Sequence, residues 1–259
     1  MIIIMNIKLQ ILLFLLSITL FNNQLISEPI ITSNEIFQPV IAKNGMVASD
    51  NKQATEAGLK ILKEGGNAID AAVTVGFTMA ATYPRAGNLG GGGFMLIYLA
   101  DSKEVIAIDY REKAPKATTR DMFLDKDGNV DKEKSRHSYL SAGVPGTVAG
   151  LSLALEKYGT IPIKKAINPA IKYAKDGIIV DYELQSSLNA VKDRMNNSPS
   201  AFKTFFKKGG SSYEIGEKII QKDLAWSLKR IKKYGPDAFY KGKIAKKIVS
   251  DMNENNGLI

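Results

Sequence analysis

The amino-acid sequence predicts an α+β fold for most of its 259 residues. Helical patterns fill most of residues 50–83, two apolar strand-like segments lie within residues 94–110, and helical patterns dominate again from about residue 181. A hydrophobic content of 45% and a charged content of 24% are ordinary for a globular protein. The length suits one large domain or two small ones.

The N-terminal segment is interpreted as an export signal rather than part of the fold. Residues 11–21 are apolar but short for a membrane span, which needs about 20 such residues, and Ser27 is a small residue suited to cleavage. An uncleaved anchor is the alternative. We expect a signal peptide over 1–27, a leader over 28–43, the folded part over 44–259, and a periplasmic or extracellular location.

Composition excludes several kinds of site. The chain has no cysteine, which rules out disulfides, thiolate metal sites and a cysteine nucleophile.

The formal net charge of the chain is +9, and residues 201–259 carry 13 basic and 6 acidic side chains. The lysines spread over several predicted helices, so a solvated surface is a simpler interpretation than a nucleic-acid site. Export and the lack of a nucleic-acid-binding motif agree with that interpretation.

The first elements are a short strand and two helices. Residues 45–49 are predicted to form a buried strand, and Asp50 is predicted to cap the first helix. Gly65 and Gly66 end that helix. Asn67 then caps a second helix with Asp70 in its first turn. This second helix has almost no polar face, which predicts burial between other layers.

A glycine-rich segment over residues 87–93 follows the second helix. Phosphate-binding loops run from a strand into a helix, whereas this one leads into the apolar segment 94–99. The glycines are therefore assigned to close backbone approach. Residues 94–99 and 105–110 form a predicted hairpin, and their apolar character predicts a sheet covered on both faces.

The remaining elements are predominantly helical. Residues 117–140 are polar and include a turn over 125–129. The lone histidine, His137, lies in this segment beside Ser135 and Ser138 and is interpreted as a surface residue, because a serine–histidine pair requires a spatial arrangement that spacing does not give. Helices are predicted over 148–158, 163–175, 182–195, 224–234 and 242–253.

Four motifs together resemble the γ-glutamyltransferase family. They are Gly58–Ala72 (GLKILKEGGNAIDAA), Gly87–Met95 (GNLGGGGFM), Ile108–Pro115 (IDYREKAP) and Gly143–Gly150 (GVPGTVAG). Their order and spacing match the N-terminal part of the family's large subunit. The resemblance runs from about Asn44 to the last residue.

The resemblance implies a fold and a reaction. The fold is the four-layer αββα sandwich of N-terminal-nucleophile hydrolases, of which about the first half is expected here. A precursor, the zymogen, cuts itself into a large and a small subunit. The new N-terminal threonine attacks γ-glutamyl amides such as glutathione, with its own α-amine as general base. The acyl group then passes to water or to amino-acid or peptide acceptors, with no cofactor or metal.

The resemblance assigns one substrate-binding residue, Arg111, to the α-carboxylate of the γ-glutamyl group. A planar guanidinium can donate two parallel hydrogen bonds to a carboxylate. From the residues alone, a structural ion pair with Asp109 or Glu112 is the simpler interpretation; the surrounding motif favours substrate binding. Asp109 and Glu112 are then candidates to orient Arg111.

No catalytic residue is expected in this chain, because the threonine nucleophile of the resemblance lies beyond residue 259. None of the threonines Thr55, Thr118, Thr119 and Thr147 occupies a processed N-terminus in the family pattern. The chain alone is therefore expected to be inactive and poorly soluble. The alternative is an inactive remnant that retains γ-glutamyl binding through Arg111, which titration with glutamate would detect.

Overall fold

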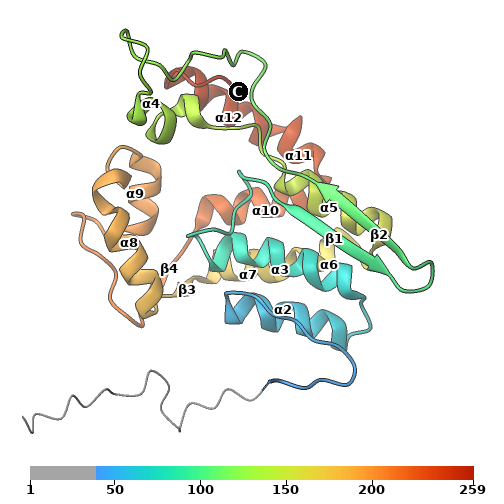
Figure 1. The fold of residues 1–259 in the computed structure, drawn as a ribbon. Helices are drawn as coiled ribbons and strands as arrows, with labels where there is room; N and C mark the ends of the chain where they lie inside the picture. The colour runs from blue at the N-terminus through green and yellow to red at the C-terminus, as the bar shows by residue number, and fades with distance from the viewer. Residues whose placement is uncertain (1–38) are drawn as a thin grey trace, which may run out of the picture. The chain divides into compact units, whose positions relative to one another are not determined.

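The structure is a computed structural model that describes residues 39–259, of which residues 44–259 form one unit (Figure 1). The predicted signal peptide over 1–27 and most of the predicted leader lie outside the described residues. Among the described residues, no helix combines the length and the apolar character that crossing a membrane requires.

The N-cap of the first helix lies one residue later than predicted. Helix α2 spans Lys52–Lys63, and its cap is Asn51, whose side chain accepts a hydrogen bond from the backbone N–H of Ala54 at 3.0 Å. The prediction of Asp50 as the cap is wrong. The capping residue is the one with extended backbone directly before the first helical residue, and here that residue is Asn51. Residues 45–49 do not form the predicted strand, since they find no ladder partner within the described part of the chain.

Helix α3 is the central helix of the unit. It spans Ala68–Thr82 and starts with a complete capping box: the Asn67 side chain accepts the Asp70 N–H at 2.9 Å, and the Asp70 carboxylate accepts the Asn67 N–H at 2.8 Å. The predicted cap and the predicted burial are both confirmed. Asp70 is fully buried, and its carboxylate also accepts hydrogen bonds from the Thr160 hydroxyl at 2.6 Å and from the Thr160 N–H at 2.8 Å.

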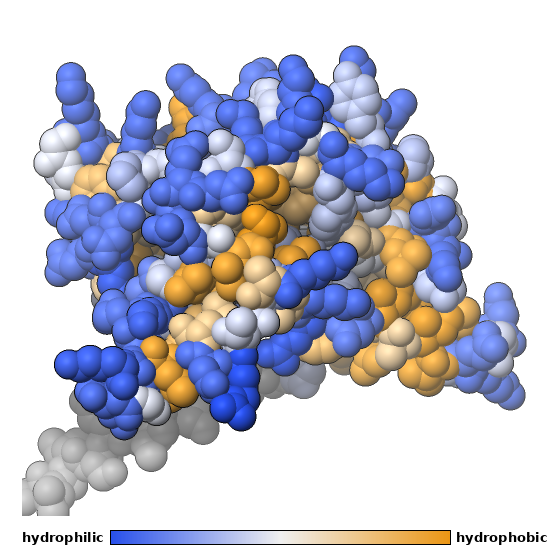
Figure 2. All heavy atoms as spheres, turned by 90° about the horizontal axis from the view of Figure 1, so that it is seen from above, coloured by the Kyte–Doolittle hydropathy of each residue, from blue (hydrophilic) through white to orange (hydrophobic). Residues whose placement is uncertain are grey.

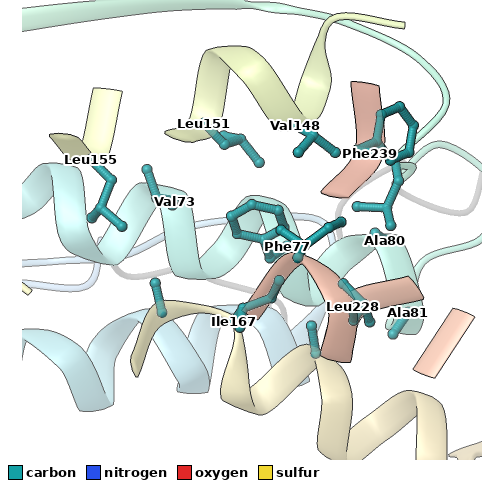
Figure 3. Packing of buried hydrophobic residues seen from close by; sticks show 14 of the residues in the cluster. Val73, Phe77, Ala80, Ala81, Val148, Leu151, Leu155, Ile167, Leu228 and Phe239 are labelled. Atoms are coloured by element: carbon teal, nitrogen blue, oxygen red, sulfur yellow. The ribbon is translucent and has the colours of Figure 1, made fainter. Parts of the chain in front are cut away.

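The hydrophobic core surrounds α3. Helices α2, α5 (Thr147–Tyr158) and α7 (Asn168–Asp176) pack against it. Figure 3 shows the ring of Phe77 between Val148 and Leu151 on one side and Ile167 and Leu228 on the other. Burying one such side chain contributes about 1.5–3 kcal/mol. This packing gives the sheet and the loops beside it a fixed support.

The predicted hairpin is confirmed, but only one of its faces is covered. Strands β1 (Phe94–Leu99) and β2 (Glu104–Asp109) pair antiparallel, with Met95 opposite Ile108 and Ile97 opposite Ile106. These four side chains pack on the core. The other face carries large apolar side chains that are 63–77% exposed: Phe94, Leu96, Tyr98 and Val105. The prediction of a sheet covered on both faces is therefore wrong for the described residues. Figure 2 shows hydrophobic and hydrophilic residues side by side on one face of the molecule.

The segment between the hairpin and α5 is less irregular than predicted. It contains helix α4 (Lys132–His137) and a 3-10 turn, η1 (Tyr139–Ser141), where the sequence predicted only polar loop. Asp131 caps α4 by accepting the N–H groups of Glu133 and Lys134, both at 3.0 Å. Polar composition hid this short helix because it buries no apolar stripe.

The predicted helix over 163–175 is two helices. Helix α6 spans Ile163–Ala166, and α7 begins at Asn168 with Pro169 in its first turn. Proline lacks the N–H that a continuous helix would need, so the chain restarts there.

The C-terminal part is helical apart from one small ladder. Helix α8 has the predicted bounds, Tyr182–Met195, and is followed by α9 (Pro199–Phe205), α10 (Lys222–Tyr234), α11 (Asp237–Tyr240) and α12 (Lys243–Glu254). Strands β3 (Ile178–Ile179) and β4 (Lys218–Ile219) pair over two residues each, too few for an alternating pattern in the sequence. Helices α9 and α11 and this ladder were not predicted. The predicted α+β class is confirmed.

Candidate substrate-binding site around Arg111

Arg111 lies two residues beyond the end of β2 and presents an exposed side chain. Its backbone N–H donates to the Asp109 carboxylate at 3.0 Å. Its guanidinium forms no ion pair with any residue of the described range 39–259, including Asp109 and Glu112. Asp109 thus contacts the Arg111 backbone and leaves the guanidinium available to an external anion.

Glycines from two distant segments close around the backbone that carries Arg111. A Cβ atom on Gly92 would lie 2.6 Å from the Tyr110 carbonyl oxygen and 2.8 Å from the Arg111 Cα. A Cβ atom on Gly146 would overlap with the same carbonyl oxygen, and one on Gly150 would overlap with the Tyr110 side chain. Only glycine permits this approach. Three of the four sequence motifs therefore meet at residues 110–111.

Hydrogen bonds hold the glycine segments together. The Asn88 side-chain oxygen accepts the Gly91 N–H at 2.7 Å and the Thr147 hydroxyl at 2.9 Å. The Gly91 carbonyl accepts the N–H groups of Gly146 at 2.7 Å and Thr147 at 3.0 Å. Asn88 therefore links the two glycine segments through its side-chain oxygen.

Two tyrosines that sequence reasoning missed fix the same region. Tyr110 is half-buried, and burial raises the pKa of its hydroxyl. Tyr240 of α11 donates to the Pro145 carbonyl at 3.0 Å and accepts the Ala149 N–H at 3.0 Å. Burial raises the pKa of Tyr240. The position of Tyr110, directly before the motif arginine, was a sequence signal that could have pointed to it. Tyr240 lies 91 residues from Ala149 in the sequence, and no local pattern links the two.

The other candidates stay apart from this site. His137 ends α4 and is exposed. Ser135 and Ser138 donate to the backbone carbonyls of Lys132 and Lys134, at 3.3 and 2.6 Å, and not to the imidazole. The structure therefore forms no serine–histidine pair at His137.

The threonines also have structural contacts. Thr147 is buried and bonded to Asn88, and the Thr55 hydroxyl lies 2.7 Å from that of Ser49. Thr118 and Thr119 are exposed. Within residues 39–259, no group of three or more histidine, aspartate or glutamate side chains is arranged to hold a metal ion.

A cavity of about 750 Å³ lies between α8, α9 and the residues flanking α2 and α3. Apolar side chains of α8 and α9 line it, with the Arg85–Glu183 ion pair, 3.3 Å long, among its polar residues. Arg111 does not line this cavity. We place the candidate site at Arg111, because the glycine motifs converge there and the cavity uses none of them.

The mixed helix and sheet architecture and the exposed arginine define an α+β protein with a candidate carboxylate-binding site. A family profile described as gamma-glutamyltranspeptidase matches residues 54–259. The chain belongs to the γ-glutamyltranspeptidase family.

Curated relatives agree with the family. The glutathione hydrolase proenzyme of Escherichia coli K12 is 52% identical over 225 residues, which are 87% of this chain and 39% of the relative. The glutathione hydrolase proenzyme of Bacillus subtilis 168 is 41% identical over 86% of this chain and 38% of the relative. The chain thus spans about two fifths of the length of these relatives.

Solved structures carry the same fold. Helicobacter pylori γ-glutamyltranspeptidase superposes with a TM-score of 0.83 at 47% identity, over 86% of this chain and 63% of that one. A cephalosporin acylase from Bacillus halodurans superposes with a TM-score of 0.77 at 26% identity, over 90% of this chain and 44% of that one. The predicted fold, that of the N-terminal-nucleophile hydrolases, is confirmed.

Proposed function

We propose that this chain is part of an exported γ-glutamyltransferase that cleaves glutathione and other γ-glutamyl amides. The observation that supports this most directly is the Arg111 guanidinium, which has no ion-pair partner among residues 39–259 and is exposed at a strand end that two glycine segments support. These contacts fix the backbone of Arg111 without neutralising the charge of its guanidinium. The 52% identity to a glutathione hydrolase proenzyme supports the substrate class.

Arg111 would bind the α-carboxylate of the γ-glutamyl donor. Two parallel N–H donors of the guanidinium match the two carboxylate oxygens, and charge assistance makes these bonds stronger than neutral ones. Asp109 would keep the turn after β2 in place through its bond to the Arg111 N–H. Glu112 neighbours Arg111 in the sequence and would add negative charge beside the site, which favours donors whose amino group is protonated.

The chemical step would use a threonine supplied by the rest of the precursor. Its hydroxyl oxygen attacks the γ-amide carbonyl while its α-amine takes the hydroxyl proton. The amide C–N bond breaks, the leaving amine takes a proton, and an ester links glutamate to the threonine. Water or an acceptor amine then releases the γ-glutamyl group.

The exposed face of the β1–β2 hairpin supports an association with the remainder of such a precursor. Leu96 and Val105 are 77% and 71% exposed on this face, which is unusual for a soluble protein. We propose that the part of the precursor that becomes the small subunit covers them. Arg111, two residues beyond the end of β2, would then lie close to the threonine that this subunit carries.

A chimera tests the proposal. Residues 44–259 replace the matching part of the Escherichia coli glutathione hydrolase proenzyme. We expect the chimera to cleave itself into two subunits and to hydrolyse a γ-glutamyl anilide, with glutamate as a competitive inhibitor. A chimera that matures into two subunits but neither hydrolyses the anilide nor binds glutamate would contradict the proposed function. A chimera that binds glutamate without hydrolysis would favour the inactive γ-glutamyl-binding alternative.

A further inference from the structure

Helices α10 and α12 carry a dense group of cations. From residue 229 to residue 247 the sequence has eight lysine and arginine residues, and a single acidic one, Asp237. Six of these cations, together with two aromatic residues, form what we call the α10–α12 cationic face. Its members are Trp226, Lys229, Arg230, Lys233, Tyr234, Lys243, Lys246 and Lys247.

Helical spacing places these residues together. On α10 the positions 226, 229, 230, 233 and 234 follow i, i+3, i+4, i+7, i+8 and form one stripe, while Ala225, Leu228 and Ile231 face the core. On α12 the positions 243, 246 and 247 form a similar stripe. The Lys247 ammonium lies 5.9 Å from the centre of the Trp226 ring, so the two stripes meet.

The cations of this face are not neutralised. Within the described residues, none of the six forms an ion pair. Helix α2 of the same chain differs, because its Lys52 and Lys60 pair with Glu56 and Glu64. Crowded like charges repel each other and gain from an anionic partner. Solvent exposure alone does not explain why so many unpaired cations gather on one face.

Aromatic rings of the face contact several of its cations. The Arg230 guanidinium carbon lies 5.2 Å from the ring centres of both Trp226 and Tyr234. Its buried Nε atom has no hydrogen-bond partner among the described residues. The Lys233 ammonium lies 5.0 Å from the Tyr234 ring, and Tyr234 remains 52% exposed. The face thus combines positive charge with amphipathic rings at the surface.

This combination fits a phospholipid surface better than a nucleic acid. Five of the six cations are lysines, which act as point charges and suit a diffuse layer of phosphates, and the one arginine is held in its stack. The rings of Trp226 and Tyr234 already contact the Arg230 guanidinium and the Lys233 ammonium, whereas single-strand binding uses aromatic ring faces on which bases can stack. Tryptophan and tyrosine favour the membrane–water interface. We propose that the α10–α12 cationic face docks the protein on an anionic phospholipid surface.

Vesicle flotation with the full chain tests this inference. Vesicles contain either phosphatidylglycerol mixed with phosphatidylcholine or phosphatidylcholine alone, and flotation separates bound protein from aggregates, which sink. Five lysines of the face are changed to glutamine: Lys229, Lys233, Lys243, Lys246 and Lys247. Five lysines elsewhere that form no ion pair within residues 39–259 are changed in the control: Lys63, Lys103, Lys157, Lys203 and Lys208.

We expect binding to the anionic vesicles only, weakened by at least about tenfold in the face variant, since each lysine near an anionic surface adds roughly fivefold in affinity. The control variant, with the same net charge, should bind as the unmodified chain does. The apolar N-terminal segment is present in all three proteins, so it cannot produce this difference. Equal binding by the face variant and the unmodified chain, or equal loss in both variants, overturns the inference.

The single tryptophan of the sequence, Trp226, gives a second readout at the face itself. Its emission should move to shorter wavelength on addition of anionic vesicles and stay unchanged with phosphatidylcholine alone. Flotation without an emission change would place the contact elsewhere and overturn the inference. Tighter binding to a single-stranded oligonucleotide than to the vesicles, in the same buffer, would also overturn it.

Discussion

The carbonyl oxygen of Tyr110 occupies the place that a side chain on Gly146 would need. The contact joins residues far apart in the sequence and brings the start of α5 against the backbone that carries Arg111. Gly146 also donates its N–H to the Gly91 carbonyl at 2.7 Å. The conformation at Arg111 therefore depends on a residue that would not touch a substrate.

Gly146→Ala should destabilise the fold. The added methyl group must push the Tyr110 carbonyl away, and overpacking of this kind costs about 1–3 kcal/mol. Gly90→Ala is the matched control, because a Cβ atom there meets nothing within 4 Å. Urea unfolding followed by circular dichroism measures both. Equal stability of the two variants would show that the Gly146 contact relaxes without cost.

Arg111→Ala, in the active chimera, should weaken donor use by about 2–5 kcal/mol, or roughly 30- to 4,000-fold in kcat/KM. Arg111→Lys should recover only part of this, since an ammonium keeps the charge but not the paired donors. Arg120→Ala is the control, because Arg120 is an exposed arginine bonded to Asp121 at 2.8 Å. Unchanged kinetics with Arg111→Ala would remove Arg111 from the site.

The sequence motifs predicted where the candidate site lies but not the long-range contacts that support it. Glycine runs and the arginine lie in contiguous motifs, so their resemblance to a family could be seen directly. The bond from Tyr240 to Pro145 joins residues 95 positions apart, and no local pattern marks it. The hairpin was recognised from its apolar strands, but composition could not show that only one face meets the core.

The exposed face of the hairpin should limit solubility. Leu96→Thr combined with Val105→Thr removes two apolar side chains that are 77% and 71% exposed, while threonine keeps the preference for strands. We expect a higher soluble yield and weaker binding of anilinonaphthalene sulfonate by the chain. The control is Ile97→Thr on the buried face, which should instead unfold the protein. Unchanged yield in the double variant would place the cause of low solubility elsewhere.

Asp70 should make the stability of the unit dependent on pH. Burial by itself raises the pKa of this carboxyl, but hydrogen bonds from the Thr160 hydroxyl and from the N–H groups of Asn67, Thr160 and Ile161 outweigh burial, and the net pKa is lowered. A carboxylate with a lowered folded-state pKa contributes stability above its unfolded pKa of about 3.9. That stability is lost as the pH falls through the folded-state pKa.

Asp70→Asn should therefore cost about 2–4 kcal/mol at neutral pH, because the amide loses charge assistance and turns a donor toward N–H groups. Unfolding free energies measured from pH 7 down to pH 3 should begin to converge for the original protein and the variant only below about pH 4. Asp101→Asn, an exposed aspartate in the hairpin turn, should show no such difference. A gap between the original protein and the Asp70→Asn variant that stays constant down to pH 3 would mean that the contribution of Asp70 does not depend on its charge.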